Sequence, residues 1–358
     1  MKPLKSPFAS QPFIYSRWRG RVYAILGLIV LLVLVIIFAT TIGSVEIPFS
    51  TTSSILLSRL PFVDITPTWT SALETIVLDI RLPRVILAGV VGAALAIAGA
   101  SYQGLFRNPL ADPYLIGVAQ GAALGAVIGF LLPVSWQALG MSLVPVLAFA
   151  GALASVAVVY TLARVGRTVP VTTLILAGVA LGALLGAVVA YLAITSGQML
   201  HGILFWLTGS FSLSQWSEVK VVVPIVTIGA GVILLFARSL NVMQLDEEQA
   251  QHLGVNVERL KLVLLATATL VTAAAVSFVG IIGFVGIIIP HAVRLIWGPD
   301  YRFLLPLSIL SGAIFLILAD ILARTVAAPS EIPIGVITAL FGAPFFLYLL
   351  RRRARLLF

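Results

Sequence analysis

The chain has 358 residues, of which 60% are hydrophobic and only 10% are charged. Soluble globular domains carry about a quarter of their residues as charged side chains, so this composition excludes an ordinary soluble protein. The formal net charge is +9, and the absence of cysteine excludes disulfides, thiolate metal sites and cysteine nucleophiles. We therefore expect an integral membrane protein.

Apolar runs of roughly 20 residues recur along the chain, and an α-helix of that length crosses the hydrocarbon core of a bilayer. A membrane β-barrel would instead show alternating segments of about ten residues. The pattern predicts an all-α protein with about ten transmembrane helices in one domain, residues 24–350, between an N-terminal tail, 1–23, and a basic tail, 351–358. The first run is too long for the apolar region of a signal peptide and should remain as a span. The predicted spans are 24–43, 84–103, 114–133, 141–163, 171–195, 220–238, 262–281, 283–297, 303–324 and 333–350.

The basic residues divide unequally between the two sides of these spans. If the chain starts inside and alternates, all but five of the 22 lysine and arginine residues fall on the cytoplasmic side. The positive-inside rule therefore places both termini in the cytoplasm. The same asymmetry explains the isoelectric point of about 10.3 without a nucleic-acid partner. The five exceptions are Arg59, Arg81, Arg84, Lys220 and Arg324.

The predicted membrane centres contain almost no ionisable residues, since Asp320 and Arg324 lie near the end of a span. Ion-coupled carriers use charged groups at mid-depth, so if this chain is a transporter, the energy for transport would have to enter from outside the bilayer. The sequence contains no G-x-x-x-x-G-K-[ST] motif, so a partner would have to bind the nucleotide. The three histidines do not have ligand spacing, and we expect no metal site.

Two further features of the sequence concern helix position and helix packing. Residues 70–80, before the second span, have the composition of a short amphipathic helix on the membrane surface. Small residues recur in rows in the second span, with Gly92 and Gly99, and near the split at Ile282, with Gly283 and Gly286. Such rows permit close approach of helix backbones, which favours packing over a ligand role.

Residues 241–261 form a polar island between two long apolar spans. Asp246 can serve as the N-cap of a short helix, Gln249 occupies the position that closes a capping box, and Gly254 can supply a left-handed C-cap. The pattern predicts a helix of about two turns on the cytoplasmic side. Either it docks against a partner, or it is a solvated loop helix with none.

Two further segments carry candidate functional residues. The turn 107–113 contains two prolines that prevent a continuous helix and make it a rigid cytoplasmic connection. On the outer side, Arg81, Arg84 and Arg324 are either anchors that snorkel to the interface or exposed cations that pair with carboxylates of a docking protein.

The chain resembles the FecCD-type permease family of iron-siderophore, haem and cobalamin importers. The resemblance covers nearly everything after residue 80. The matching motifs are RLPR (81–84), RNPLADPYLIGVAQGA (107–122), LILAGVALG (174–182), FWLTGS (205–210), DEEQAQHLGV (246–255), SFVGIIGFVGIIIPHAVR (277–294) and EIPIGVITALFGAPFFLYLLRR (331–352).

The resemblance implies the fold of a type II ABC importer permease in the bacterial inner membrane, which is not itself an enzyme. A second copy of the chain would complete the pathway, two ATP-binding subunits would hold ATP and magnesium, and an extracytoplasmic substrate-binding protein would deliver a bulky metal chelate. The chain itself would contact membrane lipid and bind no cofactor and no nucleic acid.

The resemblance also implies roles for particular residues. The polar island would be the coupling helix that fits the ATPase, the three outer arginines would face acidic residues of the binding protein, and the cytoplasmic gate would lie at the 107–113 turn and the start of the fifth span. The coupling residues are Asp246, Glu247, Glu248, Gln249, His252, Leu253, Gly254 and Val255; the docking residues are Arg81, Arg84 and Arg324; the gate candidates are Asn108, Leu110, Val171 and Thr172.

A secondary carrier driven by an ion gradient is the alternative, because it would also be a glycine-rich ten-span bundle. The absence of charges at mid-membrane argues against it. Within the importer hypothesis the motifs are shared by ferric siderophore, haem and corrinoid permeases, so the cargo stays open, with an iron chelate favoured by its frequency in the family.

Overall fold

The computed structural model describes residues 13–43, 45–59, 61, 63, 65–133, 142–166 and 168–357. Within these ranges the regular structure is helical apart from one isolated bridge between Val165 and Thr168, which confirms the all-α class. The elements are α1 Phe13–Thr41, α2 Phe49–Leu57, α3 Ser71–Thr75, η1 Ile76–Arg81, α4 Leu82–Leu105, η2 Pro113–Ile116, α5 Val118–Leu131, α6 Leu143–Ala163, α7 Val171–Thr195, η3 Gly197–Met199, α8 Leu200–Leu207, α9 Trp216–Leu235, α10 Ala237–Met243, α11 Glu247–His252, α12 Val257–Val279, α13 Val285–Trp297, α14 Tyr301–Thr325 and α15 Ile334–Leu357.

The apolar helices match the predicted spans. Among the described residues, seven helices are long and apolar enough to cross a membrane. Three shorter apolar helices, Val118–Leu131, Val285–Trp297 and Ile334–Tyr348, complete the set of ten. The predicted split near Ile282 is also confirmed, because the backbone leaves the helical conformation between α12 and α13.

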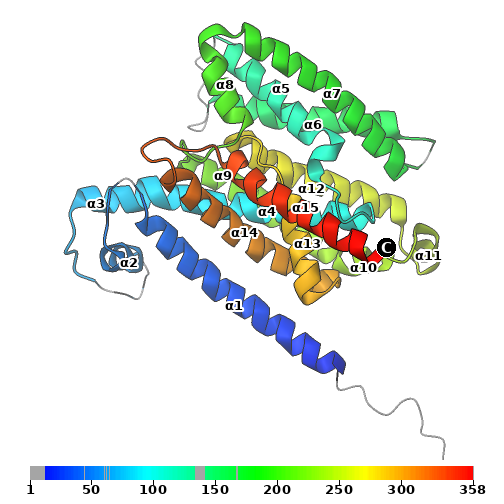
Figure 1. Ribbon diagram of the computed structural model, residues 1–358, viewed down its shortest axis with the longest axis horizontal. Coiled ribbons are helices and arrows are strands. Elements are labelled where there is room, and N and C mark those ends of the chain that lie inside the picture. Colours follow the sequence, from blue (N-terminus) through cyan, green and yellow to red (C-terminus); the bar gives the residue numbers. More distant parts are fainter. Residues whose placement is uncertain are drawn as a thin grey trace, which may run out of the picture.

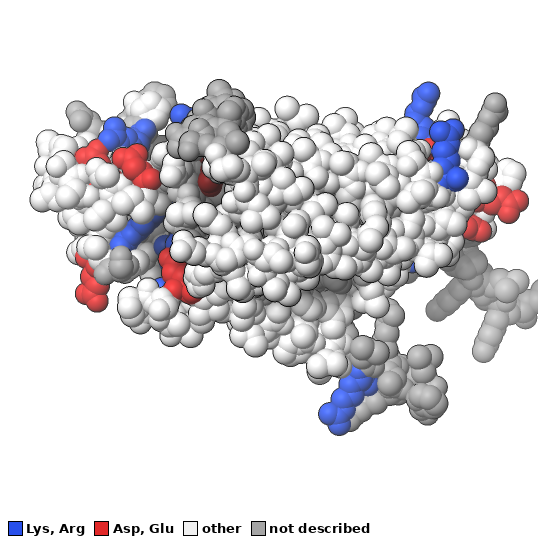
Figure 2. Space-filling view, turned by 90° about the horizontal axis from the view of Figure 1, so that it is seen from above, with Lys and Arg blue, Asp and Glu red and all other residues white. Residues whose placement is uncertain are grey.

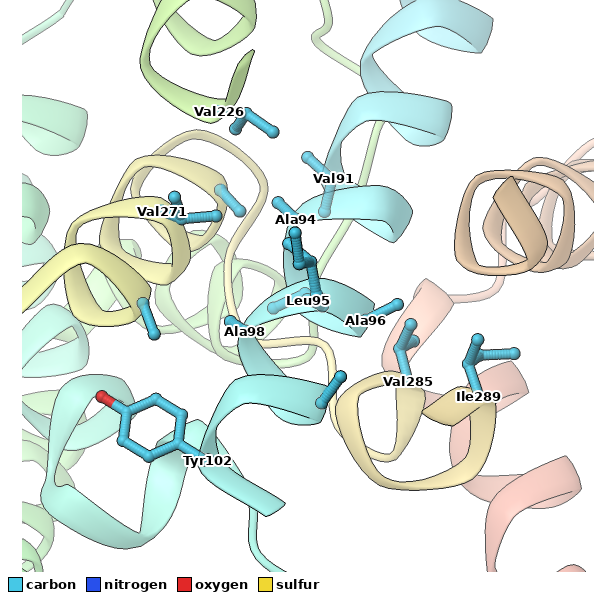
Figure 3. Close-up of a cluster of buried hydrophobic side chains, with 14 of the residues drawn as sticks. Val91, Ala94, Leu95, Ala96, Ala98, Tyr102, Val226, Val271, Val285 and Ile289 are labelled. Carbon is cyan, nitrogen blue, oxygen red and sulfur yellow. The ribbon is translucent and has the colours of Figure 1, made fainter. Parts of the chain in front are cut away.

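Helix α4 lies at the centre of the bundle, in contact with α9, α12, α13 and α14 (Figure 1). Figure 3 shows its Leu95 and Ala98 surrounded by Val226 of α9, Val271 of α12 and Val285 of α13. Nearly every α4 residue after the first turn is buried. Helices α5, α6, α7 and α8 form a second group beside this core (Figure 1).

Small residues let α4 approach its neighbours closely, as the sequence predicted. A Cβ atom added to Gly99 would lie 1.9 Å from the carbonyl oxygen of Gly286 in α13, and one added to Gly92 would lie 2.2 Å from that of Gly312 in α14. No side chain could occupy either position without moving a backbone. Gly283 does not share this role, since a Cβ atom there would meet nothing within 4 Å.

The expectation of a separate surface helix at residues 70–80 is wrong. Helix α3 continues through the π-helical turn η1 directly into α4, giving one helix of 35 residues. The N–H of Leu82 donates to the carbonyl of Val77, five residues back. Pro83 lacks an N–H and its ring would clash with an α-helical carbonyl in the preceding turn, so the wider π turn lets the helix continue.

Charged side chains gather towards the two ends of the molecule on the face shown in Figure 2, and the middle is almost free of them. Helix α1 begins and α15 ends towards the end that carries α10 and α11 (Figure 1). Both described chain ends therefore lie on the same side of the apolar band. Their cytoplasmic location remains a prediction.

Candidate functional site

Helix α11 is the short capped helix that the polar island predicted. The Asp246 carboxylate accepts a hydrogen bond from the N–H of Glu247 at 2.7 Å. At the other end Gly254 has a φ of 84°, and the N–H groups of Gly254 and Val255 donate to the carbonyls of Gln251 and Ala250. These two bonds form a Schellman motif, which ends the helix at a fixed residue.

The predicted capping box does not form. Gln249 is exposed, and its side chain makes no hydrogen bond with any described residue. Instead, the Asp246 carboxylate accepts a hydrogen bond at 2.9 Å from the guanidinium of Arg107. The N-cap of α11 is thereby joined to the 107–113 turn, whose first residue has a φ of 51°.

A buried lysine joins α11 to the neighbouring helices at this end of the molecule. Lys261 of α12 donates to Glu247 at 2.8 Å and to Glu258 at 3.2 Å, and its side chain is 9% exposed. The second carboxylate oxygen of Glu258 accepts from the N–H of Val169, just before α7 begins. These bonds connect α11 to both α12 and the start of α7. The connection is firm, because separating a buried charge from its partner is costly.

The face of α11 that points away from this network is exposed. Glu248, Gln249 and His252 are solvent-exposed, and Leu253 exposes 64% of its surface. Ala250 is buried on the opposite side. The residues predicted for coupling therefore divide into an inner set, in which Asp246 and Glu247 are bonded to neighbouring segments and Val255 packs against the core, and an outer exposed set.

The gate candidates lie in two segments, the 107–113 turn and the first turn of α7. The side chain of Asn108 accepts a hydrogen bond from the N–H of Leu110 at 3.0 Å, which fixes the turn and leaves Leu110 55% exposed. Asp112 caps η2, and burial raises its pKa to about 6, against the opposing effect of the Tyr114 N–H. Val171 and Thr172 form the first turn of α7, where Thr172 is exposed.

The three outer arginines are largely buried, so the structure does not show the exposed cations of the docking hypothesis, and their contact with a binding protein stays a prediction. Arg84 is 13% exposed and binds two carboxylates at once. Its Nε and Nη2 donate to Asp320 at 2.8–3.1 Å, and its Nη1 and Nη2 donate to Glu331 at 2.7 and 3.0 Å. This geometry links α4, α14 and the segment before α15.

Arg81 and Arg324 instead bind the carboxyl end of α1. Arg81 donates to the carbonyls of Thr40, Thr41 and Val45, and Arg324 donates to those of Ala39 and Ile42. The last carbonyls of a helix have no partner within it and carry partial negative charge. Two guanidinium groups from α14 and η1 satisfy them, so burial of these arginines has a structural reason.

Asp320 and Glu331 are the site residues that the sequence interpretation missed. Asp320 is four residues before Arg324, with its carboxylate 3.5 Å from Nε of that arginine. The i,i+4 spacing on one helix was the available signal. The partner Arg84 could not be identified in this way because it is more than 200 residues away.

No group of three or more His, Asp or Glu side chains that could hold a metal ion occurs in the part of the chain that the structure describes.

Comparison with known proteins agrees with this architecture. The FecCD transport family matches residues 31–352. The cobalamin import system permease protein BtuC of Halobacterium salinarum is 52% identical over 280 residues, covering 78% of this chain and 74% of that protein. The hemin transport system permease protein HmuU of Yersinia pestis is 45% identical over 278 residues, covering 77% and 83% respectively.

A solved structure described as an inward-facing conformation of a metal-chelate type ABC transporter has a TM-score of 0.78 and 32% sequence identity, and the match covers 92% of this chain and 98% of that one. The family match spans most of the sequence, and the helical architecture agrees with it. The chain belongs to the FecCD transport family and is a multi-pass permease of the inner membrane.

Proposed function

We propose that this chain is the transmembrane subunit of an ATP-driven importer that carries a bulky metal chelate into the cytoplasm. The observation that supports this most directly is α11, a helix fixed to the bundle on one side and exposed on the other. A rigid helix of this kind can pass a displacement of a partner into the spans. A solvated loop helix would need neither the Schellman motif nor the buried lysine.

The partner at α11 is proposed to be an ATP-binding subunit, with ATP and magnesium bound there and not on this chain. Leu253 is the strongest contact candidate, because an exposed leucine beside a charged surface gains from burial. Movement of α11 would reach the 107–113 turn through Arg107 and the start of α7 through Glu258. These are the two segments proposed as the cytoplasmic gate, which would alternate between two arrangements.

A second copy of the chain is proposed to face α7 and α15. Tyr191 and Ile194 of α7 are 68% and 77% exposed, and Leu340 and Leu347 of α15 are 65% and 68% exposed. Apolar faces of this extent within the spans contact either lipid or another protein. The pathway would lie between the two copies, with mostly apolar walls that offer the chelate no deep binding site.

At the outer end, a substrate-binding protein is proposed to deliver the cargo. Arg84 and the partly exposed Glu331 are the candidate contacts, since the pair lies at the edge of the buried cluster. Arg81 and Arg324 would contribute by holding the end of α1 in place. To pair directly with the binding protein, Arg81 or Arg324 would have to give up its hydrogen bonds to the α1 carbonyls.

The decisive experiment is uptake into proteoliposomes that contain this chain, its ATPase and its binding protein. Cobalamin, haem and a ferric siderophore are offered separately, with and without internal ATP. Accumulation of one compound that requires ATP is the expected result and identifies the cargo. Accumulation that ignores ATP and follows an ion gradient would overturn the proposal in favour of a secondary carrier.

The coupling assignment has its own test. Leu253→Asp should release the ATPase from detergent-solubilised complexes, whereas Leu213→Asp, an equally polar change at the opposite end where the leucine is 81% exposed, should leave ATPase retention unchanged. Retention of the ATPase by both variants, with uptake also intact, would show that α11 is not the coupling helix.

A further inference from the structure

A groove of about 490 Å³ runs between α6 and α12, two helices that pack side by side (Figure 1). Leu153, Ala157 and Tyr160 line one wall and Leu262, Ala266 and Leu270 line the other. No residue of the lining carries a formal charge. The volume lies within the range of small-ligand sites, and both walls belong to membrane-spanning helices.

Two arginines lie at one end of this groove. On α12, Arg259 precedes Leu262 by three residues and Ala266 by seven, so all three share one helical stripe. On α6, Arg164 follows Tyr160 by four residues and lies directly after the last helical residue. Because Tyr160 and Leu262 line the same groove, the two arginines are at its same end.

Both arginines are exposed and have no carboxylate partner within the described residues. Arg164 uses its Nε to donate to the carbonyl of Gly166, which leaves its two terminal nitrogens available. Glu258, the acid adjacent to Arg259 in the sequence, is already occupied by Lys261 and by the N–H of Val169. The mouth of the groove is therefore positive while its walls are uncharged and mostly apolar.

We propose that this groove binds an anionic phospholipid, with one acyl chain against α6 and α12 and the phosphate at Arg164 and Arg259. Guanidinium groups bind phosphate oxygens in a bidentate manner, and basic pockets between membrane helices accept anionic headgroups. The lipid would lie beside Glu258 and the loop before α7, where its presence would fix the loop that joins α6 to α7. The inference depends on the membrane location of the chain and is independent of its cargo.

The test uses native mass spectrometry of the full-length chain with its partner subunits, titrated with phosphatidylglycerol and, separately, with phosphatidylethanolamine. Wild type should retain phosphatidylglycerol preferentially. One arginine near an anionic headgroup changes lipid affinity about fivefold, so Arg164→Gln with Arg259→Gln should reduce that preference by about twenty-five-fold. Arg238→Gln removes an exposed arginine on α10 and should leave the preference unchanged.

A second pair of variants tests the groove itself. Ala157→Trp fills the groove and should abolish retention of both lipids, whereas Ala154→Trp places the same side chain on the same helix outside the lining and should not. If Ala157→Trp does not fold, Ala266→Trp fills the groove from the α12 wall and should likewise abolish retention of both lipids. Equal phosphatidylglycerol retention by the arginine variants and wild type, or equal effects of the two α6 tryptophans, would overturn the proposal.

Discussion

Replacement of Arg84 by methionine should cost about 3 kcal/mol of stability, because it leaves a buried carboxylate without its main partner. The side chain of Asp320 is 2% exposed and receives three hydrogen-bond contacts from Arg84. Removal of one partner from a buried ion pair costs about 3–5 kcal/mol. Arg324 remains 3.5 Å from Asp320 and compensates in part, so the lower end of that range applies.

The contribution of Glu331 to this cost is small. Its side chain is 31% exposed, and exposed ion pairs contribute at most about 1 kcal/mol. Glu331→Gln should therefore destabilise the chain by less than about 1 kcal/mol. Arg59→Met offers a control at the same end of the molecule, since Arg59 is 61% exposed in its pair with Glu74, and its expected cost is also below about 1 kcal/mol.

The assay is reversible unfolding in detergent micelles, followed by circular dichroism, for wild type, Arg84→Met, Asp320→Asn and the double variant. The two single changes should not add, because the double variant removes both members of the Arg84–Asp320 pair and leaves neither of them buried without the other, and their coupling energy should exceed about 1 kcal/mol. Unfolding of Arg84→Met at the wild-type denaturant concentration would refute the structural role of Arg84, and a loss of binding-protein affinity at that unchanged stability would leave docking as its role.

Three further changes test other parts of the structure. Gly99→Ala should cost at least about 1–3 kcal/mol in the same unfolding assay, because its Cβ would lie 1.9 Å from the Gly286 carbonyl; wild-type stability would contradict the α4–α13 contact. Gly254→Ala should cost about 1 kcal/mol at the end of α11, where φ is 84°, and should weaken ATPase retention; unchanged retention would separate the cap from coupling. Hydrogen bonds from Arg302 lower the pKa of Asp300 to about 2, so this group stabilises the fold above about pH 4 and loses its effect as the pH falls towards 2. Solvent screening limits this effect to about 1 kcal/mol, and Asp300→Asn should flatten the stability profile between about pH 4 and 2.

The sequence alone determined the helical class, the ten apolar helices and the short capped helix at 247–252. These features depend on local properties: the length of an apolar run decides whether a helix crosses the bilayer, and capping involves residues within one turn. The same local character explains why the position of Gly254, directly after the short polar helix, was enough to assign it to the C-cap. Motif order along the chain then identified the family.

Local patterns could not determine the continuity of α3 with α4. Pro83 signals a helix boundary in sequence, and the π turn η1 that lets the helix pass it has no sequence signature of its own. Likewise, the capping box at Gln249 was locally plausible, but Asp246 binds Arg107 from a distant turn.

Only the tertiary structure decided what the outer arginines do. A cation near the end of a span can snorkel, pair with a carboxylate or cap a helix, and the sequence is the same in each case. Arg84 pairs with carboxylates 236 and 247 residues away, and Arg324 caps α1 across 282 residues. The packing of α1, α4 and α14 brings these groups together, and burial then makes pairing compulsory, because an unpaired charge away from water is costly.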